Sequence, residues 1–199
     1  MKSPGEAKQA IIEAAEELFA RYGFRKTSID DIARAAGIGK GTVYLHFSSK
    51  EELFAEIVRR VSDRMLDRLT SAVKRARTPA GKLRAFIETS LIAVAEIAAE
   101  YHLHEETMLE LIPLGMSLRQ DHEARERSLL VEVLREGDAC GAFVVEHPER
   151  LARGIAACLD GLDAVAVQHP HGAEVRAGLD ELVTVLLRGL SPAHRSPTP

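Results

Sequence analysis

The chain has 199 residues, a formal net charge of −4 at pH 7 and no tryptophan. This length suffices to bury one or two hydrophobic cores, and the acidic balance argues against a protein that coats nucleic acid with its whole surface. The longest apolar run, residues 91–99, is interrupted by Glu96 and is too short to cross a bilayer of about 30 Å. Because no segment alternates polar and apolar residues for long, we expect an all-α fold of about nine helices.

Cysteine usage and the amino end indicate the compartment. Cys140 and Cys158 have no spacing typical of a metal site, and nothing at the amino end resembles a secretion signal. A reduced, cytoplasmic protein is therefore the simplest interpretation. We expect no cofactor, no bound metal and no membrane partner.

The first predicted helix begins at Ser3, which is suited to cap it, and Glu6 completes a capping box. Apolar residues then recur every three or four positions, and Gly23 is expected to end the helix. Tyr22 and Phe24 are expected to lie in the core. This helix would pack beneath the two shorter helices that follow.

A short helix and a tight turn come next. Thr27 and Ser28 carry hydroxyl groups that can cap the helix, and Asp30 and Asp31 supply an acidic first turn. Gly37 is expected to end the helix, since glycine takes the positive φ of a tight turn without a steric penalty.

The third helix is expected from Lys40 to Phe47, with Val43 and Phe47 facing the core. The outward residues are hydrogen-bond donors, an aromatic ring and a glycine that lets the backbone approach a surface: Lys40, Gly41, Thr42, Tyr44 and His46. Two helices joined in this way are typical of a helix-turn-helix, whose second helix enters the major groove of DNA. Residues 21–50 hold six basic and only two acidic residues, which suits a protein that meets DNA with one surface.

The segment 27–53, TSIDDIARAAGIGKGTVYLHFSSKEEL, resembles the signature of the TetR family of bacterial transcriptional repressors. The matching positions are the small residue of the second helix, the turn, the third helix and the start of the fourth: Ala33, Gly37, Gly39, Lys40, Gly41, Thr42, Val43, Tyr44, His46, Phe47, Lys50 and Leu53.

The resemblance implies which residues contact DNA. Lys40 would approach the groove and Thr42 would meet base edges, while Tyr44 and His46 would bind phosphate groups. The full predicted set is Thr27, Ser28, Gly39, Lys40, Gly41, Thr42, Tyr44, Leu45, His46 and Lys50. For each of these residues the alternative is an ordinary solvated side chain.

The remaining chain is predicted to form longer helices. A fourth helix from about Ser48 to Arg77 is long enough to connect two domains, and the break at 78–81 ends it. Further helices are expected at 79–101, up to Pro113, and at 116–139, 148–168 and 173–190. The predicted domains are a helix-turn-helix DNA-binding domain over 1–48, an effector-binding and dimerisation domain over 49–190, and a disordered tail over 191–199.

The last two predicted helices carry apolar residues on more than one face, which is typical of helices that meet a partner. The resemblance implies that they form a four-helix bundle with the same pair of a second subunit. The predicted interface consists of Leu151, Ile155, Leu159, Leu162, Val175, Leu179, Leu182 and Leu186. A monomer with a large core is the alternative.

The resemblance also implies a small-molecule effector that binds among the later helices, tilts the fourth helix and releases the DNA. The candidate pocket residues, each also a candidate for plain core, are Phe86, Ser90, Leu91, Val94, Met108, Leu111, Met116 and Phe143. His102, His104 and His122 lie close in sequence to acidic residues and leave a metal-responsive regulator open.

Together these patterns predict a ligand-responsive repressor that binds a palindromic operator on double-stranded DNA as a homodimer. An activator or an effector-independent regulator of the same fold is kept as an alternative. A helical enzyme is disfavoured because no nucleophile, base and orienting residue share a recognisable spacing. A structural nucleoid protein would be basic throughout, whereas this chain is acidic outside residues 21–50.

Overall fold

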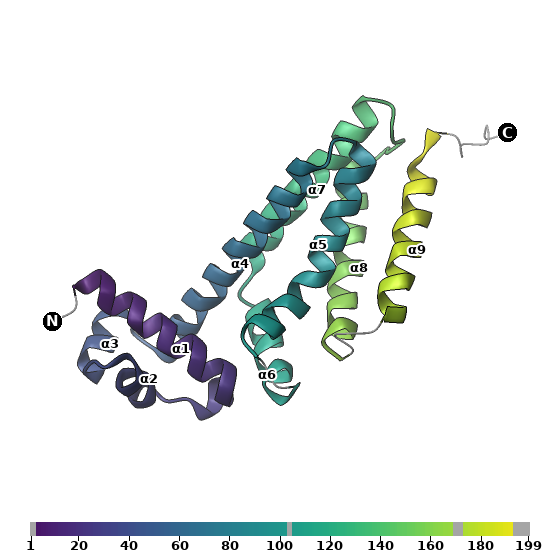
Figure 1. Ribbon diagram of the computed structural model, residues 1–199. Coiled ribbons are helices and arrows are strands. Elements are labelled where there is room, and N and C mark those ends of the chain that lie inside the picture. The colour runs from purple at the N-terminus through teal and green to yellow at the C-terminus, as the bar shows by residue number, and fades with distance from the viewer. Residues whose placement is uncertain (1–2, 103–104, 169–172, 193–199) are drawn as a thin grey trace. The chain divides into compact units, whose positions relative to one another are not determined.

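A computed structural model of the protein describes residues 3–102, 105–168 and 173–192 (Figure 1). Helices make up the regular secondary structure of these residues, which confirms the predicted all-α fold. In chain order they are α1 (Pro4–Lys26), α2 (Ile29–Ala36), α3 (Lys40–His46), α4 (Lys50–Arg75), α5 (Pro79–Glu100), α6 (Glu105–Met116), α7 (Gln120–Ala139), α8 (Pro148–Gln168) and α9 (Ala173–Leu190). None of the described helices is long and apolar enough to cross a membrane.

The chain groups into two compact units. The first unit comprises Met1–Asp63 and Glu96–Gln120, and the second comprises Arg64–Ala95 and Asp121–Pro199. Two of the three boundaries between the units therefore fall inside α4 and α5, and the third follows Gln120, the first residue of α7.

The predicted functional domains, 1–48 and 49–190, are defined by their roles and not by internal contacts. The grouping into units does not test these roles, so the domain division stays a prediction. Most of the tail that we expect to be disordered, residues 193–199, lies outside the described residues.

The first unit is organised around a buried cluster from α1, α2, α3 and the start of α4. Its fully buried aliphatic side chains are Ile11, Ile12, Ile32, Val43 and Leu53. The rings of Phe19, Phe24 and Phe54 pack against one another with centroids 5.2–5.6 Å apart. Because burying each such side chain contributes about 1.5–3 kcal/mol, this core fixes α2 and α3 against α1.

The two ends of α1 differ in how well the sequence predicts them. The capping box is confirmed, since the Ser3 hydroxyl accepts a hydrogen bond from the Glu6 amide at 3.3 Å and Glu6 accepts one from the Ser3 amide at 2.7 Å. Gly23, with φ of 82° and ψ of 165°, is not helical and interrupts α1 where the sequence predicts its end, and a short helical segment then continues to Lys26. The carboxylate of Glu110, in α6, occupies the space that a side chain at Gly23 would take.

The expectation that Tyr22 is a core residue is wrong. Its side chain is 45% exposed, and the guanidinium of Arg21 lies 5.2 Å from the centre of its ring. Phe24 takes the core position instead, because the kink lets its ring reach Phe19 and Phe54.

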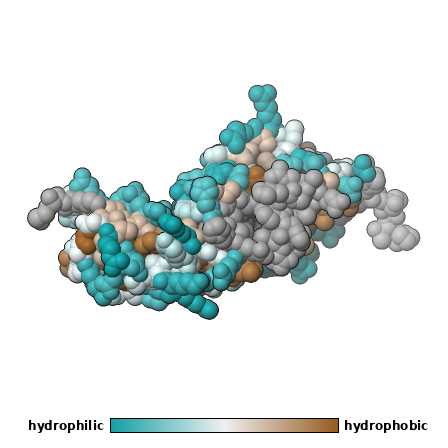
Figure 2. All heavy atoms as spheres, turned by 60° about the horizontal axis from the view of Figure 1, so that its bottom comes forward, coloured by the Kyte–Doolittle hydropathy of each residue, from teal (hydrophilic) through white to brown (hydrophobic). Residues whose placement is uncertain are grey.

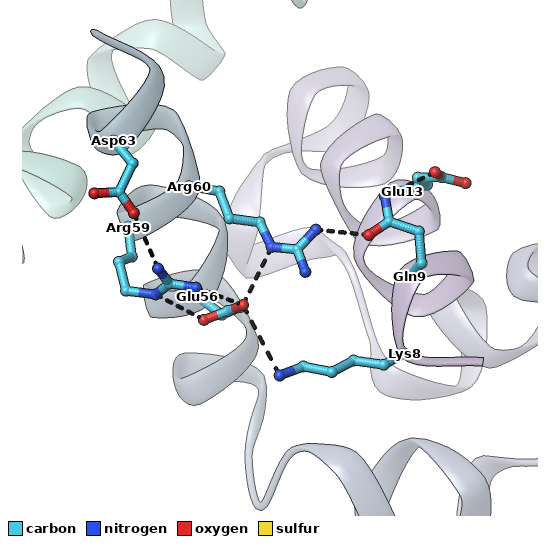
Figure 3. A network of polar contacts seen from close by, with 7 residues as sticks. All are labelled: Lys8, Gln9, Glu13, Glu56, Arg59, Arg60 and Asp63. Atoms are coloured by element: carbon cyan, nitrogen blue, oxygen red, sulfur yellow. Dashed lines mark hydrogen bonds and ion pairs between the residues drawn. The ribbon is translucent and has the colours of Figure 1, made fainter. Parts of the chain in front are cut away.

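A polar network joins α1 to the first turns of α4 (Figure 3). Glu56 accepts hydrogen bonds from Arg59 at 3.0 Å and from Arg60 at 3.1 Å, and its carboxylate lies 3.9 Å from the ammonium of Lys8. Arg60 also donates to the side chain of Gln9 at 2.7 Å. The hydrogen bond from Arg59, more than the other contacts, lowers the pKa of Glu56. The beginning of α4 is thus attached to α1 by charge as well as by apolar contact.

The second unit has its own buried cluster from the later part of α4 and from α5, α7, α8 and α9. Its largest fully buried side chains are Leu83, Ile87, Leu130, Leu134 and Val183. The ring of Phe143 lies where a side chain at Gly137 would be, so glycine is required at that position. The Val144 amide donates to the carbonyl of Leu190 at 2.9 Å, which attaches the segment after α7 to the end of α9.

Two predicted helix limits are wrong. The short helix was expected to end before Pro113, but α6 includes this proline and runs to Met116, and α7 begins at Gln120 rather than at Met116. Pro113 lies in the last turn of α6, where its missing N–H removes a single intrahelical hydrogen bond. The limits expected for α5, α8 and α9 agree with the structure to within one residue.

Candidate nucleic-acid interface

The conformation of α2 and of the turn after it is fixed by local hydrogen bonds. The Ser28 hydroxyl accepts from the Asp31 amide at 3.2 Å, and the Asp31 carboxylate accepts from the Ser28 amide at 3.3 Å. The hydrogen bond from the Ser28 side chain is the main reason that the pKa of Asp31 is lowered. Gly37 follows α2 with φ of 68°, and the Ile38 amide donates to the Ala33 carbonyl at 3.0 Å. This is the left-handed helix end that glycine favours, as the sequence predicts.

Thr27 does not fit its predicted role as a DNA contact. Its side chain is buried, and its hydroxyl donates to the carbonyls of Gly23 at 2.8 Å and Leu18 at 3.2 Å. The hydroxyl therefore secures the end of α1 and points away from solvent. Ser28, which is exposed, is the residue that caps α2.

The short helix α3 faces two ways, as predicted. Val43 and Phe47 are buried in the core of the first unit. Tyr44 is 49% exposed and Leu45 is 83% exposed, and Gly39, Lys40 and Gly41 are exposed as well, while Thr42 and His46 are half-buried. Hydrophilic side chains cover most of the face of the first unit seen in Figure 2, with small separate hydrophobic areas between them.

The ammonium of Lys50 is turned toward the protein. It donates to the carbonyls of Phe24 at 2.8 Å and Thr27 at 3.0 Å, and it lies 4.3 Å from the centre of the Phe24 ring. These contacts attach the start of α4 to the end of α1. In this arrangement Lys50 stabilises the base of the helix-turn-helix, and its role as a phosphate contact stays a prediction.

Two of the basic residues in this region are paired with the aspartates of α2. The ammonium of Lys40 lies 2.7 Å from the Asp30 carboxylate, and the guanidinium of Arg34 lies 3.1 Å from that of Asp31. The hydrogen bond and the negative charge of Asp30 raise the pKa of Lys40, which is therefore charged at neutral pH. The positive charge that the sequence places around α3 is thus partly balanced by its own neighbours.

The predicted effector-pocket residues are divided between the two cores. Phe86, Leu91 and Phe143 are buried in the cluster of the second unit, and Leu111 packs on the cluster of the first. Ser90 and Met116 are half-buried, and the side chains of Val94 and Met108 lie outside the described part of the chain. Because these residues are divided between the two units, nothing here tests the pocket, which stays a prediction.

The first unit contains a cavity of about 440 Å³ between α1 and the end of α5. It is lined by Glu13, Glu16, Glu17, Ala20, Arg21, Glu100, Tyr101 and His102, none of which belongs to the predicted pocket. Among the residues that the structure describes, no three His, Cys, Asp or Glu side chains are placed to hold a metal ion. His104, one of the three histidines of the predicted metal-responsive alternative, lies outside the described residues.

The face predicted for dimerisation needs a correction in α8. Ile155 and Leu159 are buried in the core of the second unit, because α8 turns this side inward. On α9, Leu182 is 51% exposed and Val185, which the sequence analysis missed, is 67% exposed. Leu151 and Leu186 are half-buried, and the side chains of Leu162, Val175 and Leu179 lie outside the described set. Leu182 and Val185 share one face of α9 at helical spacing with two of its other exposed positions, Gly178 and Gly189.

Three features define a helix-turn-helix here: a helix capped by Ser28, a glycine turn, and a helix that buries Val43 while exposing Tyr44. They place the protein in the class of DNA-binding regulators with this motif. Residues 11–57 match the sequence profile of the bacterial regulatory proteins of the tetR family. The chain is also 30% identical over 192 residues to the uncharacterised HTH-type transcriptional regulator YhgD of Bacillus subtilis, covering 94% of this chain and 97% of that one. The chain belongs to the TetR family.

Two further similarities concern proteins with named roles. The chain is 31% identical over 134 residues to the HTH-type transcriptional repressor KstR2 of Mycobacterium tuberculosis, which is 67% of each protein. It shares its fold with the transcriptional regulator FadR of Bacillus subtilis, solved in complex with stearoyl-CoA. That comparison has a TM-score of 0.64 and 21% identity, and it covers 92% of this chain and 98% of that one.

Proposed function

We propose that the protein is a transcriptional repressor that binds a palindromic operator as a homodimer and is released by a small-molecule effector. The observation that carries the proposal is the orientation of α3, which buries Val43 and Phe47 and exposes Tyr44 and Leu45. The relative KstR2 is named as a repressor, and FadR shows that the same fold holds a small ligand.

The outward residues of α3 supply the chemistry that a DNA groove requires. Lys40 offers a charged donor, and the Tyr44 hydroxyl and His46 offer donors to phosphate oxygens. Thr42 offers a hydroxyl and a methyl group to base edges, and the exposed side chain of Leu45 is suited to contact a thymine methyl group. Ser28 and Lys50, together with the backbone at Gly39 and Gly41, complete the proposed contact set, from which the buried Thr27 is withdrawn.

Dimerisation is proposed because α3, the helix that would contact the bases, is short. One α3 helix spans only a few base pairs, whereas two helices related by a twofold axis read two half-sites about 34–36 Å apart, or a multiple of this distance. The exposed apolar face of α9, centred on Leu182 and Val185, supports dimerisation through the second unit.

Release by an effector requires that the ligand bind the DNA-incompetent conformation more tightly, and the coupling is reciprocal. The proposed ligand is a small molecule that the helices after the first three enclose. An activator or an effector-independent regulator is the alternative within the same family. We propose that the protein acts in the cytoplasm, where operator DNA lies, and that its role is regulatory and not catalytic.

The experiment compares two exposed tyrosines. Tyr44→Ala should weaken binding to the operator about thirtyfold or more, because a dimer loses the contact in both half-sites at about 1–3 kcal/mol each. Tyr22→Ala is the matched control, since Tyr22 is similarly exposed but lies in α1. Anisotropy titrations measure the affinity, and light scattering should show both variants as dimers. Operator affinity equal to that of the unmodified protein for the Tyr44 variant would refute the proposed site.

A further inference from the structure

The two aspartates at the start of α2 have different partners. Asp31 closes the capping box with Ser28 and pairs with Arg34. Asp30 takes no part in this cap, and its carboxylate lies 2.7 Å from the ammonium of Lys40. Asp30 therefore connects the first turn of α2 to the first residue of α3, the helix proposed to enter the groove.

The contact between Asp30 and Lys40 is open to exchange. The Lys40 and Asp30 side chains are 51% and 56% exposed, so water and DNA both have access to the pair. Exposed ion pairs of this kind are weak and are readily replaced by other partners. The Lys40 ammonium has three N–H donors but a single positive charge, which Asp30 already partly neutralises for a second anionic oxygen.

A carboxylate and a DNA phosphate offer the same kind of ligand to an ammonium group, namely an anionic oxygen. In the protein without DNA, Asp30 fills the place that such an oxygen on DNA would take beside Lys40. When DNA arrives, its phosphate oxygens compete with Asp30 for the charge of Lys40, and the Asp30 carboxylate then lies near the phosphate backbone.

We propose that Asp30 is a positioning residue that sets the affinity for DNA, because it is an internal anion that competes with the DNA for Lys40. The proposal rests on the proposed function in one respect, which is that Lys40 contacts DNA. The competition lowers the affinity of the repressor below the value that the contacts of α3 would otherwise give. A weaker complex dissociates faster, which suits a regulator that an effector must release.

The test is a double-mutant cycle on Asp30 and Lys40, read by anisotropy titration of labelled duplex DNA. Asp30→Asn should bind DNA roughly threefold to tenfold more tightly than the unmodified protein, because the asparagine releases Lys40 without a negative charge. In a Lys40→Gln background the same Asp30→Asn change should alter the affinity less than about twofold. Titrations at about 0.2 M salt, where the Debye length is below about 8 Å, screen the repulsion between Asp30 and phosphates that lie farther away than this.

Asp67→Asn is the matched control for net charge. Asp67 is also an exposed aspartate, but it lies in the part of α4 that belongs to the second unit. This variant should bind DNA as the unmodified protein does. Because Asp30 is not part of the cap of α2, Asp30→Asn should also keep the thermal unfolding midpoint, which verifies that the variant is folded.

The outcomes separate this proposal from the proposed function. If Asp30→Asn raises the affinity equally in both backgrounds, Asp30 only repels the DNA and does not compete for Lys40. If Asp30→Asn leaves the affinity unchanged or lowers it, Asp30 does not compete either. Each of these results overturns the proposal. Lys40→Gln alone should weaken binding and reduce the salt slope by about 2 if Lys40 contacts a phosphate in both half-sites. If Lys40→Gln leaves the affinity and the salt slope unchanged, Lys40 does not contact DNA, and the proposed competition fails with that assignment.

Discussion

The two units of the molecule differ in how their structure is specified. In the first unit, short elements are fixed by contacts close in sequence, such as the capping box of Ser28 and the turn at Gly37. In the second unit, long helices bury aliphatic side chains drawn from distant parts of the chain. The helix-turn-helix surface of the first unit can therefore be recognised from the sequence. In the second unit, tertiary contacts decide which face of each helix is buried.

The largest expected effect comes from matched cavities in the two cores. Leu53 and Leu134 are both fully buried, one in each unit. Leu53→Ala and Leu134→Ala should each lower the free energy of unfolding by about 2–5 kcal/mol, through lost burial and a residual cavity. Urea denaturation followed by circular dichroism measures the loss. A change below about 0.5 kcal/mol for either variant would contradict the assignment of that residue to a core.

The next comparison separates the inner and outer faces of the second unit. Val185→Ala should weaken the dimer roughly tenfold or more and leave the stability of the fold nearly unchanged, because Val185 is 67% exposed. Ile155→Ala should instead lower the free energy of unfolding by about 2 kcal/mol or more, since Ile155 is buried within the unit. Sedimentation over a range of concentrations measures the first effect and thermal unfolding the second. A weaker dimer for Ile155→Ala, together with a lower free energy of unfolding for Val185→Ala, would instead support the dimer interface predicted from the sequence.

The smallest effect concerns the charge network between α1 and α4. Glu56 has a lowered pKa, so its charged form stabilises the folded state above its unfolded pKa of about 4.3, and this contribution is lost as the pH falls through the folded value. Glu56→Gln should therefore cost about 0.5–1 kcal/mol at pH 7, a modest amount because the partner arginines reach solvent.

The pH dependence of the destabilisation by Glu56→Gln serves as the control for this prediction. The difference in unfolding free energy between the two proteins should stay constant from about pH 7 to pH 5 and disappear below the lowered pKa of Glu56. A difference that persists undiminished at about pH 2 would show that Glu56 acts through packing and not through charge.

The sequence predicts most reliably what is encoded locally. The caps at Ser3 and Ser28, the turn at Gly37 and the two-faced character of α3 all follow from residues within a few positions of one another. Thr27 shows the limit of this approach, since a hydroxyl beside a cap residue looks equally suited to capping until the kink at Gly23 brings a carbonyl within its reach.

What the sequence does not predict depends on contacts across the chain. Ile155 and Leu159 lie on an apolar stripe that is compatible with either a core or an interface, and the packing of α8 decides for the core. Lys50 looks like a surface cation, and its partners at Phe24 and Thr27 lie more than twenty positions earlier. The pairing of Asp30 with Lys40 likewise requires the turn to place two helix starts side by side.

The central claim is that the outward face of α3, present twice in a dimer, reads a symmetric DNA sequence. The most direct test is to select duplexes from a random pool with the purified protein and to sequence those that it retains. The account predicts an enriched palindrome with half-sites about one helical turn apart or a multiple of it, and loss of this enrichment for Tyr44→Ala but not for Tyr22→Ala. Enrichment of no sequence, or of one without twofold symmetry, would contradict it.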